Sequence, residues 1–135
     1  MSLKHLRVSL LLFYDDSGNI LLNHRKDHQQ AVEEVWEIIG GGIEENENPS
    51  DTIKREIYEE LGYKIDEIKD DLKFLRKLGV AYLFKAKFPG FQSFSDTNEV
   101  KVADLKLFSI KDTLKLKLLP ISRKILGTTD INTLN

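Results

Sequence analysis

One segment, from Gly41 to Tyr63, constrains the fold most because it specifies where a helix begins and ends. It reads GGIEENENPSDTIKREIYEELGY. Asn48 is a favourable N-cap, and Pro49 suits the first helical position because the amide hydrogen that proline lacks would stay unpaired there. Gly62 suits the residue just past a helix, where a left-handed backbone is common. The segment therefore predicts a helix over residues 49–61.

Three glutamates of this helix share one face, because positions i, i+3 and i+4 are neighbours on a helix surface. They are Glu56, Glu59 and Glu60. Glu60 also lies beside the apolar stripe that begins at Ile53, so we expect it to be half-buried. Two like charges roughly 4 Å apart repel by about 4 kcal/mol at an effective dielectric near 20, so this cluster is costly without a cation. Oxygen ligands favour Mg²⁺, with Mn²⁺ as the alternative.

The same segment resembles the Nudix box, the signature of the Nudix hydrolase family, written G-x5-E-x7-R-E-U-x-E-E-x-G-U with U a bulky aliphatic residue. The matching positions are Gly41, Glu47, Arg55, Glu56, Ile57, Glu59, Glu60 and Gly62. Tyr63 departs from the pattern, and Ile39 and Asn46 stand where the family often has Pro and Gly. Asparagine tolerates a left-handed backbone, so we expect position 46 to keep a turn. An ordinary amphipathic surface helix would explain the apolar stripe but not the offsets of Gly41 and Glu47.

The resemblance implies an α/β sandwich, a mixed β-sheet with helices on both sides, that hydrolyses a nucleoside diphosphate linked to another group. It implies a metal site at Glu56, Glu59 and Glu60, with Glu47 completing or orienting the metal shell. Glu56 and Glu59 are thus catalytic candidates. Arg55 is expected to hold a catalytic glutamate in place rather than to bind substrate. Gly41 and Gly62 are expected to form structural turns.

The general base stays open between two glutamates. Family members use either a glutamate of the box or one from a downstream loop, which here gives Glu56 or Glu99. Glu99 lies in the polar segment 96–99 between two predicted strands. A loop acid that only faces water would look the same in the sequence.

Four residues outside the box are candidates for substrate binding. Arg25 and Lys26 end the second predicted strand, where their charges can bind a phosphate. Phe91 and Phe94 lie in a polar loop, where either ring can stack on a nucleobase, a contact that contributes roughly 1–3 kcal/mol. Packing of both rings as a small apolar cluster under the loop is the alternative.

The order of predicted elements also favours an α/β sandwich. We expect one domain over residues 1–126 and a loose tail over 127–135, since the tail is polar and lacks periodicity. Residues 65–78 have helical spacing at first, but the resemblance favours strand over much of 72–88. The other predicted strands are Leu6–Phe13, Ile20–His24, Val35–Ile39 and Leu105–Ile110, residues 26–34 are a predicted polar loop, and Pro120–Leu126 is a predicted short helix.

Composition narrows the function classes. The 135 residues include no cysteine, which excludes zinc–thiolate sites, cysteine nucleophiles and the cysteine-dependent isopentenyl diphosphate isomerases that share the Nudix fold. The net charge of −2 gives no electrostatic attraction to nucleic acid or to an anionic membrane. The apolar run Val8–Phe13 is too short to span a membrane. We expect a cytoplasmic location, a small-molecule nucleotide as partner and no nucleic acid. The oligomeric state stays open.

Substrate identity is the least constrained property. ADP-ribose, nucleotide sugars, dinucleoside polyphosphates and nucleoside triphosphates all contain the diphosphate that the box recognises. The short chain without a large insertion favours a nucleoside triphosphate, hydrolysed to a monophosphate and pyrophosphate. A non-catalytic Nudix-like binding module is the alternative from another class, although such a module would usually have lost acids of the box.

Overall fold

The computed structural model describes residues 7–25, 35–130, 132 and 134. Within them the chain forms seven strands, three α-helices and two short 3-10 helices, at Phe91–Ser93 and Val102–Asp104. The elements are β1 (Val8–Tyr14), β2 (Ile20–Arg25), β3 (Val35–Glu37), β4 (Ile39–Gly42), α1 (Pro49–Leu61), β5 (Lys73–Leu78), β6 (Ala81–Lys87), β7 (Leu105–Phe108), α2 (Ile110–Thr113) and α3 (Pro120–Gly127).

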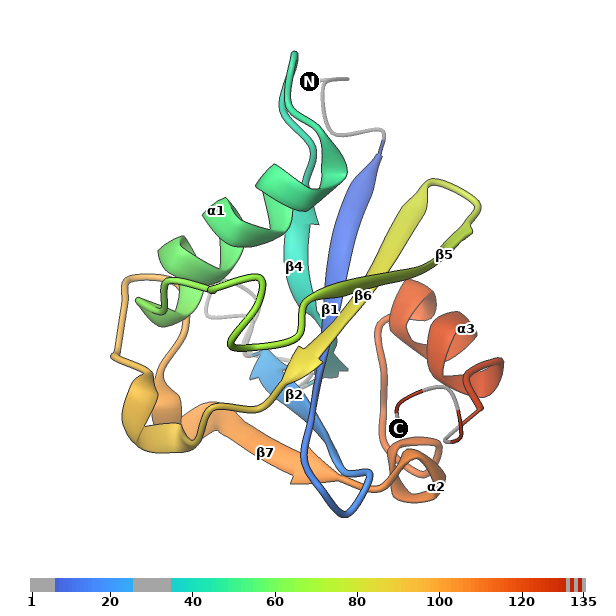
Figure 1. Cartoon of the computed structure of the whole chain (residues 1–135). Coiled ribbons are helices and arrows are strands. Elements are labelled where there is room, and N and C mark those ends of the chain that lie inside the picture. Colours follow the sequence, from blue (N-terminus) through green and yellow to red (C-terminus); the bar gives the residue numbers. More distant parts are fainter. Residues whose placement is uncertain (1–6, 26–34, 131, 133, 135) are drawn as a thin grey trace.

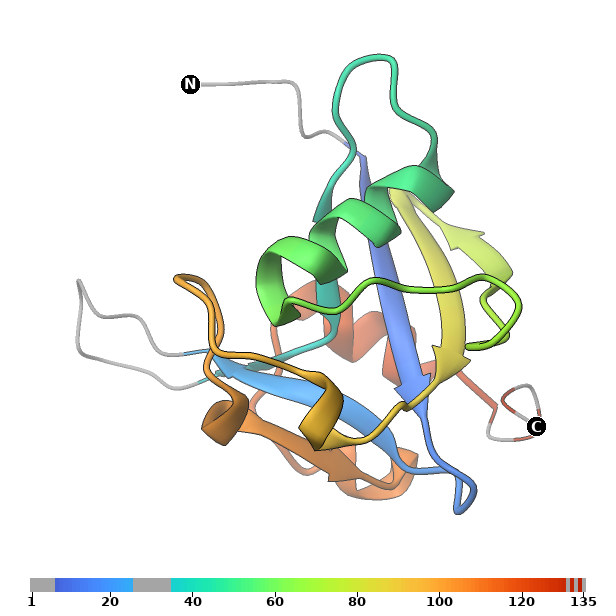
Figure 2. The same ribbon diagram turned by 60° about the vertical axis from the view of Figure 1, so that its left-hand side comes forward.

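The strands form one mixed sheet around β1. β1 runs parallel to β6 and antiparallel to β2 and β4, and the main strand order is β3-β2-β1-β6-β5. β7 pairs antiparallel with β2. α1 covers one face of the sheet and α3 covers the other (Figures 1 and 2). The predicted α/β sandwich with a mixed sheet is confirmed.

Two apolar clusters fill the two sides of the sheet. On the α1 side, the buried stripe of the helix packs against Phe13 and Phe84. On the α3 side, Ile125 packs with Leu12 and Leu83. Strands β1 and β6 are therefore buried on both faces, as expected for strands covered by helices on each side.

The predicted signals that bound α1 are confirmed. Asn48 is the N-cap, and its side-chain oxygen accepts a hydrogen bond from the Asp51 amide at 2.8 Å. Gly62 ends the helix in the left-handed conformation, with φ of 65°, and its amide donates to the carbonyl of Tyr58. Asn46 keeps the expected turn at φ of 65°. These are local signals, and each acts within one turn of the helix.

The predicted turn at Gly41 is wrong, because residues 40–42 belong to β4 and pair with β1. A Cβ atom at Gly40 would collide with the carbonyl oxygen of Ser9, and one at Gly41 would collide with the carboxylate of Glu56. Gly40 is needed for the close approach of the β1 backbone, whereas a side chain at Gly41 would displace the Glu56 carboxylate. At Gly41 the missing side chain leaves room for an acid of α1.

Residues 65–72 contain hydrogen-bonded turns, and the strand favoured for the following segment is confirmed as β5 and β6. Tyr63, which departs from the box pattern, packs its ring on Phe13 and donates its hydroxyl to Asp70 at 2.7 Å. Asp70 is 3% exposed. Tyr63 thus packs in the core, as an aliphatic residue would at this position of the box, and its hydroxyl adds a hydrogen bond to Asp70.

The prediction of a loose tail over 127–135 differs from the structure at three places. Gly127 is the last residue of α3, and Thr128 accepts a hydrogen bond from Arg76 at 2.7 Å. Leu134 is fully buried in the cluster on the α3 side. A single leucine in a polar stretch gives no periodic pattern, so its burial was not visible in the sequence. None of the described helices is long and apolar enough to cross a membrane.

Candidate functional site

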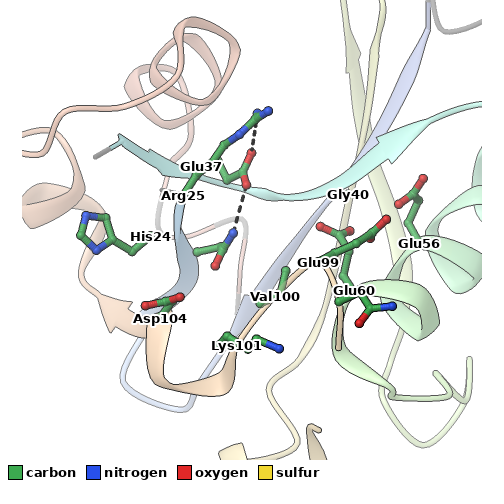
Figure 3. A pocket seen from close by; sticks show the side chains of 12 residues that line it. His24, Arg25, Glu37, Gly40, Glu56, Glu60, Glu99, Val100, Lys101 and Asp104 are labelled. Atoms are coloured by element: carbon green, nitrogen blue, oxygen red, sulfur yellow. Dashed lines mark hydrogen bonds and ion pairs between the residues drawn. The ribbon is translucent and has the colours of Figure 1, made fainter. Parts of the chain in front are cut away.

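A pocket of about 460 Å³ opens beside α1. Helix α1 forms one wall, strands β2 and β3 form the opposite wall, and the loop 95–101 lies between them (Figure 3). Most of its lining side chains are polar or charged. The lining residues are Asn23, His24, Arg25, Glu37, Gly40, Glu56, Glu60, Asn98, Glu99, Val100, Lys101 and Asp104.

Three acids from the sequence prediction line this pocket: Glu56, Glu60 and Glu99. Glu60 is the most confined, because its Oε2 atom is buried without a hydrogen-bond partner among the described residues. Burial, followed by the nearby charge of Glu56, raises the pKa of Glu60 to about 9. Burial also raises the pKa of Glu56, although Arg55 opposes this. Ionising both acids of α1 at the same time is therefore unfavourable unless a cation binds beside them.

This donor set fits a divalent cation. Carboxylate oxygens are the ligands that Mg²⁺ and Mn²⁺ prefer, and an unpaired buried carboxylate oxygen is costly in any other role. The described residues contain no preformed group of three or more metal-binding side chains. Glu56 and Glu60 supply the pair that faces the pocket, with Glu99 across from them (Figure 3).

Arg55 connects α1 to the segment before it. Its Nε and Nη2 atoms donate to the two carboxylate oxygens of Glu47 at 2.8 and 2.9 Å, and Nη2 also donates to the carbonyl of Gly42 at 2.9 Å. Nη1 donates to Glu59 at 3.1 Å and to Glu56 at 3.2 Å. Hydrogen bonding to Arg55 lowers the pKa of Glu47 to about 2. Arg55 therefore contacts Glu56, an acid that lines the pocket.

The four acids predicted as metal ligands thus divide into two pairs. Glu56 and Glu60 face the pocket, whereas Glu47 and Glu59 are bound to Arg55 and are not among the described lining residues. Both oxygens of Glu47 accept hydrogen bonds from the guanidinium group, so this acid anchors the segment before α1. Spacing on a helix cannot separate these roles, because all three helix acids share one face.

Replacing Arg55 with methionine is expected to lower the free energy of unfolding by about 2–4 kcal/mol, because the partly buried Glu47 would lose both charged hydrogen bonds. Urea titrations measure this difference. Arg25→Met is the matched control: its side chain is 59% exposed and its Nη1 atom is 3.6 Å from Glu37 Oε1, so its removal should cost less than about 0.5 kcal/mol. Equal losses in the two variants would contradict the anchoring role of Arg55.

The wall opposite α1 contains functional candidates that sequence reasoning missed. Asn23 of β2 donates its side-chain amide to Glu37 of β3 at 3.0 Å, and the two residues are direct cross-strand partners. Burial raises the pKa of Glu37. Arg25, predicted to bind phosphate, lines the same wall. Asn23 was a usable signal, since it is a buried polar residue that follows three apolar residues in β2, but its partner became visible only through strand pairing.

The predicted aromatic residues lie away from the pocket. Phe94 is 7% exposed and packs against Phe13 and Tyr63 in the core on the α1 side. Its ring is therefore not available to stack on a base. Phe91 is partly exposed and packs edge-on against Phe88. The packing alternative thus describes both rings. Lys26 and the predicted loop 26–34 lie outside the described residues.

The chain resembles known proteins in both sequence and fold. The sequence profile of the NUDIX domain matches residues 3–127. An RNA pyrophosphohydrolase from Bartonella henselae is 44% identical over 68 residues, which make up 47% of this chain and 39% of that protein. The match thus spans less than half the length of this relative.

Two solved structures share the fold. A protein from Deinococcus radiodurans aligns with a TM-score of 0.73 at 11% identity, over 90% of this chain and 80% of that one. A MutT Nudix hydrolase from Burkholderia pseudomallei aligns with a TM-score of 0.60 at 25% identity, over 91% and 96% of the two chains. Because the NUDIX domain match covers nearly the whole chain and includes the helix whose acids line the pocket, this protein belongs to the Nudix hydrolase family.

Proposed function

We propose that this protein hydrolyses a nucleoside diphosphate linked to another group, with Mg²⁺ as cofactor and a nucleoside triphosphate as preferred substrate. The products are a nucleoside monophosphate and pyrophosphate. The observation that carries the proposal is the buried Oε2 atom of Glu60, which has no hydrogen-bond partner in the described part of the chain and lies in the pocket together with Glu56. A carboxylate in this position needs a cation, and a cation in a polar pocket can bind a polyphosphate.

Glu56 and Glu60 are the residues that would hold the metal. Glu47 and Glu59, the other two acids of the box, would support them through their hydrogen bonds with Arg55. The bound ion would neutralise phosphate oxygens and lower the pKa of water. Glu99 is the proposed base: it accepts the proton as the water oxygen attacks phosphorus and the bond to the leaving phosphate oxygen breaks. Glu56 stays the alternative base. We expect this chemistry in the cytoplasm.

The opposite wall would hold the rest of the substrate. The Arg25 guanidinium is exposed and lines the pocket, so it can bind a phosphate distant from the acids. Asn23 and Glu37 present an amide and a carboxylate, which suit the hydroxyl and amino groups of a nucleoside. The wall opposite α1 would therefore bind a phosphate through Arg25 and the nucleoside through Asn23 and Glu37.

The RNA pyrophosphohydrolase among the relatives supports a second candidate, the 5′-triphosphate end of an RNA. Both candidates contain the same triphosphate, so one assay can compare them. The net charge of −2 favours the free nucleotide, because a protein that binds a long polyanion usually carries an excess of basic residues.

The test is a panel of nucleoside triphosphates, ADP-ribose, a nucleotide sugar, a dinucleoside polyphosphate and a 5′-triphosphorylated RNA, each assayed with Mg²⁺ and with EDTA. We expect Mg²⁺-dependent release of pyrophosphate from a nucleoside triphosphate. Full turnover in EDTA would overturn the metal-dependent mechanism. Faster hydrolysis of the RNA would replace the preferred substrate with the second candidate, and no hydrolysis of any compound would favour a binding module.

A further inference from the structure

We infer that Thr97 is a positioning residue, whose hydroxyl group fixes Glu99 against the helix that carries the pocket acids. The inference rests on the proposed function and on Glu99 as the base. The Thr97 hydroxyl donates to the carbonyl oxygen of Glu60 at 2.8 Å. It accepts hydrogen bonds from the amides of Val100 at 3.1 Å and Glu99 at 3.2 Å. A hydroxyl group has one donor and two acceptor sites, so these contacts use its full capacity. The carbonyl of Val100, at 3.5 Å, is a second and longer acceptor for the same hydroxyl hydrogen.

The loop 95–101 donates hydrogen bonds to carbonyl groups at the C-terminal end of α1. The last four carbonyl groups of an α-helix have no partner within the helix. Here the carbonyl of Glu60 accepts from the Thr97 hydroxyl, and that of Leu61 accepts from the amide of Ser95 at 2.9 Å. The loop therefore lies against the C-terminal end of α1 (Figure 2). Thr97 binds the backbone of Glu60, 37 positions earlier in the chain, and the side chain of Glu60 lines the pocket.

Further hydrogen bonds hold the loop in one shape. The Thr97 amide donates to the carbonyl of Val100 at 2.9 Å, and the Lys101 ammonium group donates to the carbonyl of Thr97 at 2.8 Å. Val100 is 4% exposed, and its burial in the apolar cluster on the α1 side holds this end of the loop in place. Asn98 and Glu99 remain exposed at the tip, and both line the pocket. The backbone of Glu99 is thus fixed while its carboxylate stays accessible.

A general base must stay within hydrogen-bond reach of the attacking water, and a displacement near 1 Å can cost roughly 100-fold in rate. The Thr97 hydroxyl links the backbones of Glu60 and Glu99 through a single atom. We therefore expect this contact to set the distance between the metal-binding acids and the base. A role limited to capping α1 would affect stability and leave the rate constant of the chemical step unchanged.

Thr97→Val tests this, because valine keeps the shape of threonine and removes the hydroxyl. We expect kcat for the best substrate to fall roughly 10- to 100-fold, with KM and the Mg²⁺-induced shift in melting temperature unchanged within error. Thr97→Ser restores the hydroxyl and should keep kcat within about threefold of the wild type. In a Glu99→Gln background, Thr97→Val should cause no further loss, because the base it positions is already absent.

Thr113→Val is the matched control. Thr113 is a buried threonine whose hydroxyl donates to the carbonyl of Ile110, and it is not among the described residues that line the pocket. Its replacement should lower the melting temperature and leave kcat unchanged. Wild-type kcat in Thr97→Val, a raised KM instead of a lowered kcat, or equal losses with and without Glu99→Gln would each overturn the inference. Full activity of Glu99→Gln would overturn it too and leave the hydrolase assignment intact, whereas an inactive wild type would refute the proposed function itself.

Discussion

Replacing Glu56 or Glu60 with glutamine is expected to lower kcat by a factor on the order of 10² or more in saturating Mg²⁺. Both carboxylates line the pocket, and Glu60 has a buried oxygen with no hydrogen-bond partner among the described residues. Glutamine keeps the size of the side chain and removes the charge that a divalent cation needs. Steady-state kinetics with a nucleoside triphosphate and a Mg²⁺ titration measure the loss.

Glu59→Gln is the matched control on the same helix. The Glu59 side chain is 42% exposed and pairs with Arg55, and it does not belong to the described pocket lining. We expect its loss in kcat to stay within about tenfold, since an exposed i,i+4 ion pair contributes little energy. The sequence pattern treats the three helix acids alike, so equal losses in all three variants would favour the pattern over the pocket geometry.

The sequence predicts α1 well because its signals are local. The Asn48 cap, Pro49 and Gly62 act within a few residues of the helix ends, and the apolar stripe follows from helical spacing alone. Local signals also predicted β1, β2 and β7, with ends that differ by one or two residues. The single strand predicted over Val35–Ile39 is two strands in the structure, because β3 pairs with β2 and β4 pairs with β1. The strands β5 and β6 were favoured by the family resemblance. Fold class follows from the order of these elements.

The parts of the site that the sequence could not predict depend on contacts between distant residues. Gly41 was expected to form a turn, but its role depends on a carboxylate 15 positions later on α1. Asn23 meets Glu37 only because β2 pairs with β3. Phe94 follows the same rule: its loop is polar, yet its ring fills a gap between Phe13 and Tyr63. Polar surroundings in the sequence do not exclude burial in the fold.

Without metal, the free energy of unfolding is expected to decrease as the pH rises from 5 to 9. The pKa of Glu60 is about 9 in the folded protein, mainly because of burial, compared with 4.5 for an ordinary glutamate. Between these values the folded state binds one more proton than the unfolded state. The contribution of protonated Glu60 to stability is therefore complete below the pKa that this group has in the unfolded chain. It is lost as the pH rises through the pKa that Glu60 has in the folded protein. One proton corresponds to about 1.4 kcal/mol per pH unit.

Glu60→Gln should reduce this slope, because glutamine does not titrate, and the variant should be more stable than the wild type in EDTA at pH 8. Burial raises the pKa of Glu56 and Glu37 in the same direction, so a weaker slope should persist in the variant. Mg²⁺ at 100 times its dissociation constant would add about 2.7 kcal/mol to the wild type and less to Glu60→Gln. Urea titrations across this pH range, with EDTA and with Mg²⁺, measure both effects. An identical slope in the two proteins would mean that Glu60 is already ionised in the metal-free pocket, and the strongest argument for a cation at this position would then be lost.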